Sequence, residues 1–235
     1  MQRDHTLLSR FPKQRPELSE AFQKIYAEHY KRNREGASAA SSLSQKMESW
    51  MHRKVAEDVM RGARECNTLE IGAGNLNHLQ YEPARGRYDV VESLADLVSN
   101  SPRRGQVTNA FRDLAEIRDE RYDRIISIAA FEHYCNLPEV VSRCASLLSP
   151  NGQLRVAIPS EGTLLWTLGW KLTTGLEFRL KYGLDYGVLM RHQHVNSAAE
   201  IEGVLRVFFK NVRRSVFGVS RGLSFYQFLE CSETH

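Results

Sequence analysis

The stretch from Thr68 to Leu79, TLEIGAGNLNHL, decides the fold that the sequence predicts. Leu69–Ile71 has the apolar character of a short buried strand, and Gly72–Gly74 follows it directly. Glycine lets the backbone turn tightly and approach a ligand closely, and the N–H groups of such a turn suit polar or anionic groups. A nucleotide or nucleoside site is therefore expected here. Glu70 would repel a pyrophosphate, so the pattern favours a ligand that carries positive charge.

Asn77 prevents this stretch from matching the dinucleotide-binding fingerprint, G-x-G-x-x-G. The third glycine of that motif lets helix and strand pack closely, and Asn77 stands at its position. An NAD(P)-dependent oxidoreductase on a related doubly wound sheet is therefore an alternative that both Asn77 and Glu70 disfavour.

Strand-like and helical runs alternate along the chain after the glycine turn. Strand-like runs at 88–93, 122–129 and 152–159 are separated by helical runs. This alternation implies a parallel sheet with helices on both faces. Two β-rich runs at 212–220 and 223–231, joined by an Arg-Gly turn, are expected to pair antiparallel. The predicted fold class is α/β, a doubly wound, mostly parallel sheet that ends in an antiparallel strand pair.

The chain is expected to consist of a main domain with two additions. A length of 235 residues suits one large domain with an appended segment. Residues 1–64 show helical apolar spacing in two places, separated by the small and polar run REGASAASSLSQ, and are expected to form an N-terminal helical cap or lid. Residues 65–235 form the main domain, with a helical insertion at about 160–192 after the fifth strand.

Composition restricts the class of protein. A chain with 42% hydrophobic and 26% charged residues is not disordered throughout. It has no apolar run of the roughly 18 residues that a transmembrane helix needs, and its N-terminus lacks a signal-peptide core, so a cytoplasmic enzyme or binding protein is expected. The four cysteines lack metal-ligand spacing and are interpreted as reduced thiols. The net charge of +4 comes from scattered residues, which predicts no nucleic-acid partner.

Two carboxylates follow the next two expected strands. Glu92 ends the run YDVVES, where a carboxylate can accept both hydrogen bonds of a ribose diol; a solvated strand-end glutamate is the alternative. Asp113 follows the expected third strand, where it could accept from an adenine amino group or could cap a helix. With the glycine turn, these carboxylates predict a nucleoside site at one edge of the sheet.

The order of the motifs resembles that of a known family. TLEIGAGNL, YDVVES, FRDL, YDRIISIAAFEH and LLSPNGQLRVAIP occur in the order found in class I S-adenosylmethionine-dependent methyltransferases, and the resemblance covers about Asn67 to Pro159. It implies S-adenosyl-L-methionine as cofactor, S-adenosyl-L-homocysteine as product and no metal. Leu76 is a departure, because the family often has a glycine there.

The resemblance also implies which residues hold the cofactor. In the family, the glycine loop lies against the methionine part, the acidic residue after strand two holds the ribose, and an Asp after strand three reaches the adenine. The N-terminal segment is expected to close over the cofactor from the other side. The residues so assigned are Glu70, Gly72, Ala73, Gly74, Glu92, Ser93, Asp113, Leu114 and Ala130, with Tyr30 and Trp50 from the N-terminal segment.

Catalytic candidates lie in two runs near the expected acceptor side. In SIAAFEHYCNLPE, Glu132 and His133 could form an acid/base pair that removes a proton from a hydroxyl or acidic carbon as the methyl group arrives. In RHQHVNSAAEIEGVL, His194 could project toward the pocket. Both histidines could equally be hydrogen-bonded structural residues. No Cys or carboxylate near His194 in the sequence completes a zinc-ligand set, so no metal site is expected.

Aromatic residues mark the insertion after the fifth strand. Five of them lie at multiples of four and form one stripe of a helical segment. Packing against the main domain is one interpretation. A lid over the acceptor, a homodimer contact, or a peripheral membrane contact through residues 164–190, flanked by basic residues, are the others. The stripe consists of Trp166, Trp170, Phe178, Tyr182 and Tyr186.

These features together favour one function over two alternatives. The leading hypothesis is S-adenosylmethionine-dependent methyl transfer to a small molecule or glycan intermediate, at an oxygen of a sugar or similar polar acceptor. The choice of acceptor rests on overall similarity alone, because fold says little about substrate. A non-catalytic binding subunit that keeps the fold is the second hypothesis, disfavoured by the intact carboxylates. The oxidoreductase is the third.

Overall fold

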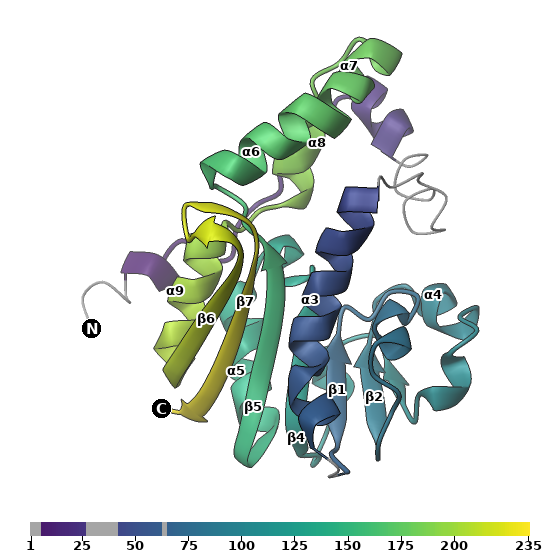
Figure 1. Ribbon diagram of the computed structural model, residues 1–235, viewed down its shortest axis with the longest axis vertical. Helices are drawn as coiled ribbons and strands as arrows, with labels where there is room; N and C mark the ends of the chain where they lie inside the picture. The colour runs from purple at the N-terminus through teal and green to yellow at the C-terminus, as the bar shows by residue number, and fades with distance from the viewer. Residues whose placement is uncertain (1–5, 27–41, 63–64) are drawn as a thin grey trace.

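A seven-stranded sheet forms the centre of the computed structural model, which describes residues 6–26, 42–62 and 65–235 (Figure 1). Its first five strands run parallel, and the last two are antiparallel to their neighbours. The predicted α/β class, with a mostly parallel sheet and a C-terminal antiparallel pair, is confirmed. In spatial order the strands are β3 (Ala110–Phe111), β2 (Tyr88–Val91), β1 (Thr68–Ile71), β4 (Tyr122–Ile128), β5 (Leu148–Pro159), β7 (Leu223–Thr234) and β6 (Phe209–Ser220).

Helices cover both faces of this sheet. The helices α5 (Leu137–Leu147) and α9 (Ala198–Phe208) cover one face, and α3 (Ser42–Arg61) lies against the other (Figure 1). Successive side chains of a strand point to opposite faces. Leu69 and Ile71 therefore pack with α5 and α9, whereas Ile126 belongs to the core on the α3 side. The sheet thus separates two apolar cores.

The helix α9 begins with a capping box that its sequence specifies. The Ser197 hydroxyl accepts a hydrogen bond from the Glu200 N–H at 3.3 Å, and the Glu200 carboxylate accepts one from the Ser197 N–H at 3.0 Å. Three apolar residues of the helix are fully buried at helical spacing, which fixes its orientation. They are Ile201, Val204 and Leu205.

Short turns replace two of the crossover helices that parallel strands commonly use. Within residues 65–235, β1 and β2 are joined through the 3-10 turn η1 (Asn77–Gln80), and β3 and β4 through η3 (Leu114–Glu116). Between β2 and β3 lie α4 (Ala95–Ser99) and η2 (Arg104–Gln106). The apolar face beside these turns is covered in part by α3, through Met51 and Val55.

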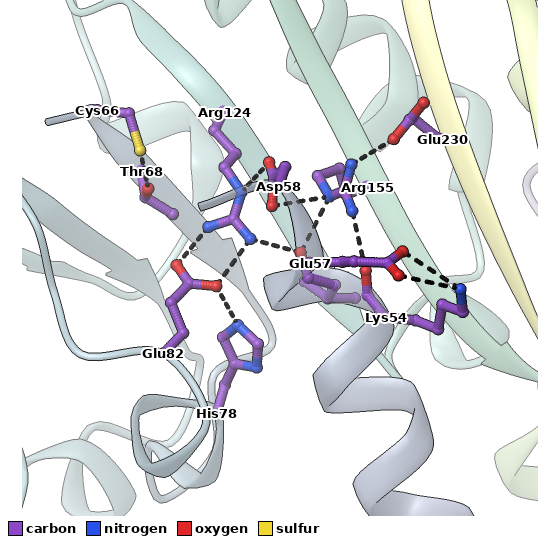
Figure 2. Close-up of polar contacts among 11 residues, drawn as sticks. Lys54, Glu57, Asp58, Cys66, Thr68, His78, Glu82, Arg124, Arg155 and Glu230 are labelled. Carbon is purple, nitrogen blue, oxygen red and sulfur yellow. Dashed lines mark hydrogen bonds and ion pairs between the residues drawn. The ribbon is translucent and has the colours of Figure 1, made fainter. Parts of the chain in front are cut away.

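Two buried arginines attach α3 to the sheet (Figure 2). The Val55 carbonyl, within α3, accepts hydrogen bonds from Arg124 Nη2 at 2.7 Å and from Arg155 Nε at 3.0 Å. Arg124 also pairs with Glu82, and its Nε lies 2.8 Å from Asp58 Oδ2. Buried charges are tolerated when they are paired and hydrogen-bonded, and this network meets both conditions.

The predicted helical insertion follows β5. It contains α6 (Leu164–Trp170), the π-helical turn η5 (Lys171–Gly175), α7 (Leu176–Tyr182) and α8 (Tyr186–Gln193). The aromatic stripe faces inward: the Trp166 ring lies 5.5 Å from that of Tyr226 in β7, and the Phe178 ring lies 5.3 Å from that of Tyr186. Phe178 is buried and the other four rings are partly exposed, so a lipid contact through these rings stays a prediction.

Part of the N-terminal segment packs on this insertion. Residues 20–26 are helical, and Phe22 and Tyr26 pack in one apolar cluster with Phe178 and Leu189.

No helix among the described residues is long and apolar enough to cross a membrane.

Candidate functional site

A cavity of about 1110 Å³ lies at the carboxyl ends of the parallel strands. Its lining includes Gly72 after β1, Glu92 after β2, Asp113 after β3 and Ala130 after β4. The strand order reverses between β1 and β4, and in open α/β sheets ligands bind in the crevice at such a point. The volume suits a nucleoside together with an acceptor.

The glycine turn after β1 depends on backbone conformations that glycine adopts without strain. Gly72 has φ +72°, and a Cβ there would lie 2.6 Å from the Ala130 Cβ. Gly74 has φ +53° and donates its N–H to Glu92 Oε2 at 2.9 Å. Leu76 has φ +64° although it is a fully buried leucine. It therefore holds the left-handed conformation that glycine would reach at lower cost.

The Glu92 carboxylate is fixed by the backbone on both sides. Oε2 accepts the Gly74 N–H, and Oε1 accepts the Leu94 N–H at 3.0 Å. The Ser93 hydroxyl donates to Oε1 at 3.4 Å, and both Glu92 and Ser93 line the cavity. These hydrogen bonds hold the Glu92 carboxylate in one orientation at the cavity wall.

Asp113 both caps a turn and lines the cavity. Its Oδ1 accepts the Ala115 N–H at 2.7 Å, which makes it the N-cap of η3. Leu114 lines the cavity beside it, and Ala130 lines the opposite side after β4. The two sequence interpretations of Asp113 are therefore compatible with each other.

Glu70 does not line the cavity, which corrects the expectation that its charge points into the crevice. Its side chain lies on the α3 side of the sheet, because β1 turns alternate residues to opposite faces. Its Oε2 accepts a hydrogen bond from the Tyr88 hydroxyl at 2.8 Å. Burial raises the pKa of Glu70 to about 8, so the group is mostly neutral at pH 7. Ala73 is likewise buried in the core on this side.

The N-terminal residues assigned to the cofactor are placed differently from the expectation. The Trp50 ring packs 5.6 Å from that of Phe217 in β6, and Trp50 does not line the cavity. Tyr30 lies outside the described residues. The described part of the N-terminal segment contributes Arg15 and Tyr26 to the lining instead.

The three predicted catalytic residues lie together at one side of the cavity. Glu132 and His133 belong to the 3-10 turn η4 (Phe131–His133), and His194 is the C-cap of α8. His133 Nε2 lies 3.9 Å from Glu132 Oε1, and the rings of His133 and His194 are 5.1 Å apart. His133 lines the cavity. Their side chains thus form one cluster although 60 residues separate them in the chain.

Glu161 is a fourth member of the cluster that the sequence analysis missed. Its Oε2 accepts hydrogen bonds from His194 Nδ1 at 2.9 Å and from Trp166 Nε1 at 2.7 Å. Its position two residues after β5 could have identified it, since Glu92 stands directly after β2 at the same edge of the sheet. The Nδ1 of His133 donates to the Gln193 carbonyl at 2.9 Å. Each ring therefore has its Nδ1 fixed by a defined acceptor.

Burial and hydrogen bonding move the pKa values of the two carboxyls in opposite directions. Loss of solvent raises the pKa of Glu132 to about 7, and one of its oxygens is buried with no hydrogen-bond partner among the described residues. The pKa of Glu161 is lowered: its partial burial opposes this, and the hydrogen bonds from His194 and Trp166 outweigh that burial. Two carboxyls whose environments separate their pKa values are a common acid/base arrangement.

The cluster also meets the spacing of metal ligands. Single ligand atoms of Glu132, His133 and His194 lie within 4.8 Å of one another. A histidine whose Nδ1 donates to a carboxylate, as in His194, is frequent around metals and around transferred protons alike. Removal of metal ions by a chelator distinguishes metal binding from proton transfer by this cluster.

A basic strap from the N-terminal segment crosses the rim of the site. Arg15 Nη1 donates to the carbonyls of His192 at 2.8 Å and Gln193 at 3.2 Å, and Nη2 donates to the His133 carbonyl. Lys13 Nζ donates to the Val195 carbonyl at 2.7 Å. The run FPKQRPEL has no periodicity that predicts these contacts, so sequence reasoning missed them.

Comparison with known proteins gives the fold a family context. The sequence matches no protein-family model and no curated protein. The structure is similar to magnesium protoporphyrin IX methyltransferase, ChlM, from Synechocystis PCC 6803 with bound S-adenosylhomocysteine: TM-score 0.58, 16% identity, 90% of this chain and 98% of that chain.

Two further solved structures show the same likeness. The N-methyltransferase NodS from Bradyrhizobium japonicum, in complex with S-adenosyl-L-homocysteine, has TM-score 0.55 and 13% identity over 82% of this chain and 88% of that chain. An O-methyltransferase family protein from Burkholderia thailandensis has TM-score 0.53 and 16% identity over 81% of this chain. This chain spans 56% of the length of the Burkholderia protein. The chain therefore has the Rossmann-like fold of class I methyltransferases.

Proposed function

We propose that this protein is an S-adenosylmethionine-dependent methyltransferase acting on a small molecule or biosynthetic intermediate. The observation that carries the proposal is the Glu92 carboxylate, which backbone N–H groups hold at the wall of a large cavity beside the glycine turn. A fixed acceptor at the end of β2 suits the two hydroxyls of a ribose. The fold shared with methyltransferases of oxygen, nitrogen and carbon supports the same class of reaction.

The residues around the cavity fit the parts of this cofactor. Gly72 and Gly74 expose backbone where a methionine moiety would lie, and Glu92 with Ser93 would hold the ribose. Asp113 and Leu114 would border the adenine. When bound, the cofactor supplies an electrophilic methyl group on a sulfonium sulfur. The acceptor atom would attack the methyl carbon in line and displace the sulfur.

The cluster beside the cavity supplies the proton chemistry for a hydroxyl acceptor. His133 reaches the cavity and would take the acceptor proton, while Glu132 beside it can share that proton because its pKa lies near neutrality. Glu161 orients His194 through the hydrogen bond to Nδ1. Positioning of the acceptor against the methyl carbon would supply most of the rate acceleration. This cluster favours oxygen of a sugar or similar polar molecule as the acceptor.

The reduced state of the thiols fits an enzyme of the cytoplasm. All four cysteines are free of disulfides, and two are fully buried. Disulfides are rare where glutathione keeps thiols reduced. We therefore assign the protein to the cytoplasm.

Calorimetric titration with S-adenosylhomocysteine tests the proposal. We expect micromolar binding by the wild-type protein and a loss of about tenfold or more for Glu92→Ala, because the ribose loses its charged acceptor. Glu177→Ala, an exposed carboxylate in α7, is the control and should bind like the wild type. NADH serves as the competing ligand.

Two results would overturn the assignment. If Glu92→Ala bound S-adenosylhomocysteine as tightly as the wild type, or if NADH bound more tightly than S-adenosylhomocysteine, the oxidoreductase hypothesis would be favoured. Tight cofactor binding without methyl transfer to any member of a broad panel of sugars, hydroxy acids and amines would favour the non-catalytic binding subunit.

A further inference from the structure

An exposed row of leucines runs along the insertion, on the side away from the aromatic stripe. Five leucines occur every four residues through α6, η5 and α7. Leucine is usually buried, so an exposed line of them along one helical stretch marks an interaction surface. This leucine row consists of Leu164, Leu168, Leu172, Leu176 and Leu180, with 63, 44, 70, 52 and 80% of each residue exposed.

The π-helical turn in the middle keeps the row on one side. In an α-helix, residues four apart rotate by roughly 40° per step, so four steps would wind such a row by roughly 160°. The turn η5 has more residues per turn and offsets part of this rotation. At a rise of about 1.5 Å per residue, the row extends over roughly 24 Å. The surface is therefore a long ridge rather than a pocket.

The insertion is apolar on two opposite sides. The aromatic residues are offset from the leucines by two positions, which in a helix places them on the other face. Trp166 and Phe178 pack against protein on that face. A helix that is apolar all round is normally covered on both sides, and only one side is covered here.

The tip of the β6–β7 hairpin, beside α6, carries two further exposed apolar residues. Val219 and Leu223 are 86 and 45% exposed. The hairpin turn lies beside α6 (Figure 1), and α6 approaches β7 so closely that a Cβ on Gly169 would lie 2.9 Å from the Phe225 ring. Tight packing at Gly169 holds α6, with the first leucines of the row, against β7 near the hairpin tip.

Charges beside the row indicate what covers it. Lys171, Arg179 and Lys181 are exposed next to leucines of the row, and Glu177 is the one acidic residue of α6, η5 and α7. The amino groups of Lys171 and Lys181 lie over the rings of Trp170 and Tyr182, at 5.8 and 4.9 Å from the ring centroids. Basic side chains that flank an apolar helix face are typical of helices that lie on membranes.

The same charges argue against a second copy of this chain as the occupant. A two-fold interface through the leucine row would bring the cations of one copy near those of the other, and like charges in an interface are costly. An anionic surface would instead attract Lys171, Arg179 and Lys181 while the leucines leave water.

We propose that the leucine row, extended by Val219 and Leu223, rests on an anionic lipid surface. The leucines enter the boundary between headgroups and acyl chains, and Lys171, Arg179 and Lys181 contact lipid phosphates. The surface is formed by different residues from the cavity, so this proposal stands apart from the methyltransferase assignment.

Co-sedimentation of the full-length protein with vesicles tests the proposal. Vesicles of phosphatidylcholine alone are compared with vesicles that also contain phosphatidylserine. We expect binding to the anionic vesicles, weakened about tenfold or more by the double variant Leu172→Glu/Leu180→Glu. The triple variant Lys171→Gln/Arg179→Gln/Lys181→Gln should lose the preference for phosphatidylserine.

Met60→Glu is the matched control, because Met60 is an exposed apolar residue of α3 outside the row. It should bind vesicles like the wild type. Thermal unfolding and S-adenosylhomocysteine titration of the same variants check that the fold and the cavity are unchanged. Absence of wild-type binding to either vesicle, or equal binding by the leucine variant, would overturn the proposal. A wild-type dimer that the leucine variant turns into a monomer in analytical ultracentrifugation would also overturn it, in favour of a second copy.

Discussion

Arg124 on β4 and Arg155 on β5 share one hydrogen-bond acceptor, the backbone carbonyl oxygen of Val55 in α3. The carbonyl lies within the helix, so the two strands hold α3 at one fixed point (Figure 2). Other donors of the guanidinium groups point at carboxylates, among them Glu82 and Asp58, and Arg155 Nη2 donates to the Lys54 carbonyl at 2.9 Å. The helix α3 of the N-terminal segment is thereby attached to the sheet through buried polar groups.

Removing one partner of this network should destabilise the protein strongly. Arg124→Met leaves the Glu82 carboxylate buried without its cation, and we expect the free energy of unfolding to fall by about 3–5 kcal/mol. The double variant Arg124→Met/Glu82→Met should lose less, because it leaves no unpaired charge there. Urea denaturation measures both. A double variant at least as unstable as the single one would contradict this explanation.

The left-handed conformation of Leu76 predicts that the Leu76→Gly variant is more stable than the Leu76→Ala variant. Leu76→Ala and Leu76→Gly both remove a fully buried side chain. Alanine keeps the penalty of φ +64°, about 1 kcal/mol or more, which glycine relieves. We therefore expect Leu76→Gly to unfold at higher urea concentration than Leu76→Ala. The reverse order would show that the left-handed conformation is not retained in solution.

Glu70 should make stability decrease as pH rises. Burial raises its pKa to about 8 in the folded protein, against an ordinary value of 4.5. The contribution of neutral Glu70 to the free energy of unfolding is complete below pH 4.5. It is lost as pH rises toward about 8, at up to roughly 1.4 kcal/mol per pH unit. Glu70→Gln cannot ionise and should flatten this decrease. Glu177→Gln, at an exposed site, should leave the slope of the wild type, and an unchanged slope in Glu70→Gln would refute the assignment.

Substitutions in the histidine cluster should lower turnover and leave cofactor affinity nearly unchanged. His133→Ala and His194→Ala are each expected to lower turnover by about 10²-fold or more for a hydroxyl acceptor, since a positioned acid/base group contributes on that scale. S-adenosylhomocysteine affinity should stay within about threefold of the wild type, because the cofactor residues lie elsewhere in the cavity. Turnover that is unchanged in both variants would remove the histidines from the mechanism.

Chelation separates proton transfer from metal chemistry in the same cluster. If Glu132, His133 and His194 transfer protons, dialysis against EDTA should leave methyl transfer unchanged. A loss that zinc or magnesium restores would assign the three residues to a metal instead. Metal analysis of the purified protein, beside the His194→Ala variant, is the independent measurement.

The parts of the site that the sequence predicted are those with a fixed place relative to a strand. Gly72, Glu92 and Asp113 each follow a strand of the parallel sheet, and the carboxyl ends of such strands meet at one edge. The fold class followed from the same alternation. Glu70 was misplaced because it lies within β1. Side chains of a strand alternate between the two faces of the sheet, and the sequence does not say which face Glu70 takes.

The insertion shows a different limit of sequence reasoning. The aromatic stripe and the leucine row have the same spacing, so the pattern alone does not say which side protein covers. Contacts with residues 20–26, far away in the chain, decided this in favour of the aromatic side. The role of α3 was missed for a similar reason, since Arg124 and Arg155 are polar residues in the middle of strands whose partners come from another segment.

The strap formed by Lys13 and Arg15 has a kinetic consequence. Arg15 joins the turn after β4 to the end of α8, two walls of the same cavity that come from distant parts of the chain. The walls cannot separate without breaking these hydrogen bonds, so Lys13 and Arg15 help to set the residence time of any ligand in the cavity. Replacing these two side chains would speed the exchange of whatever the cavity holds.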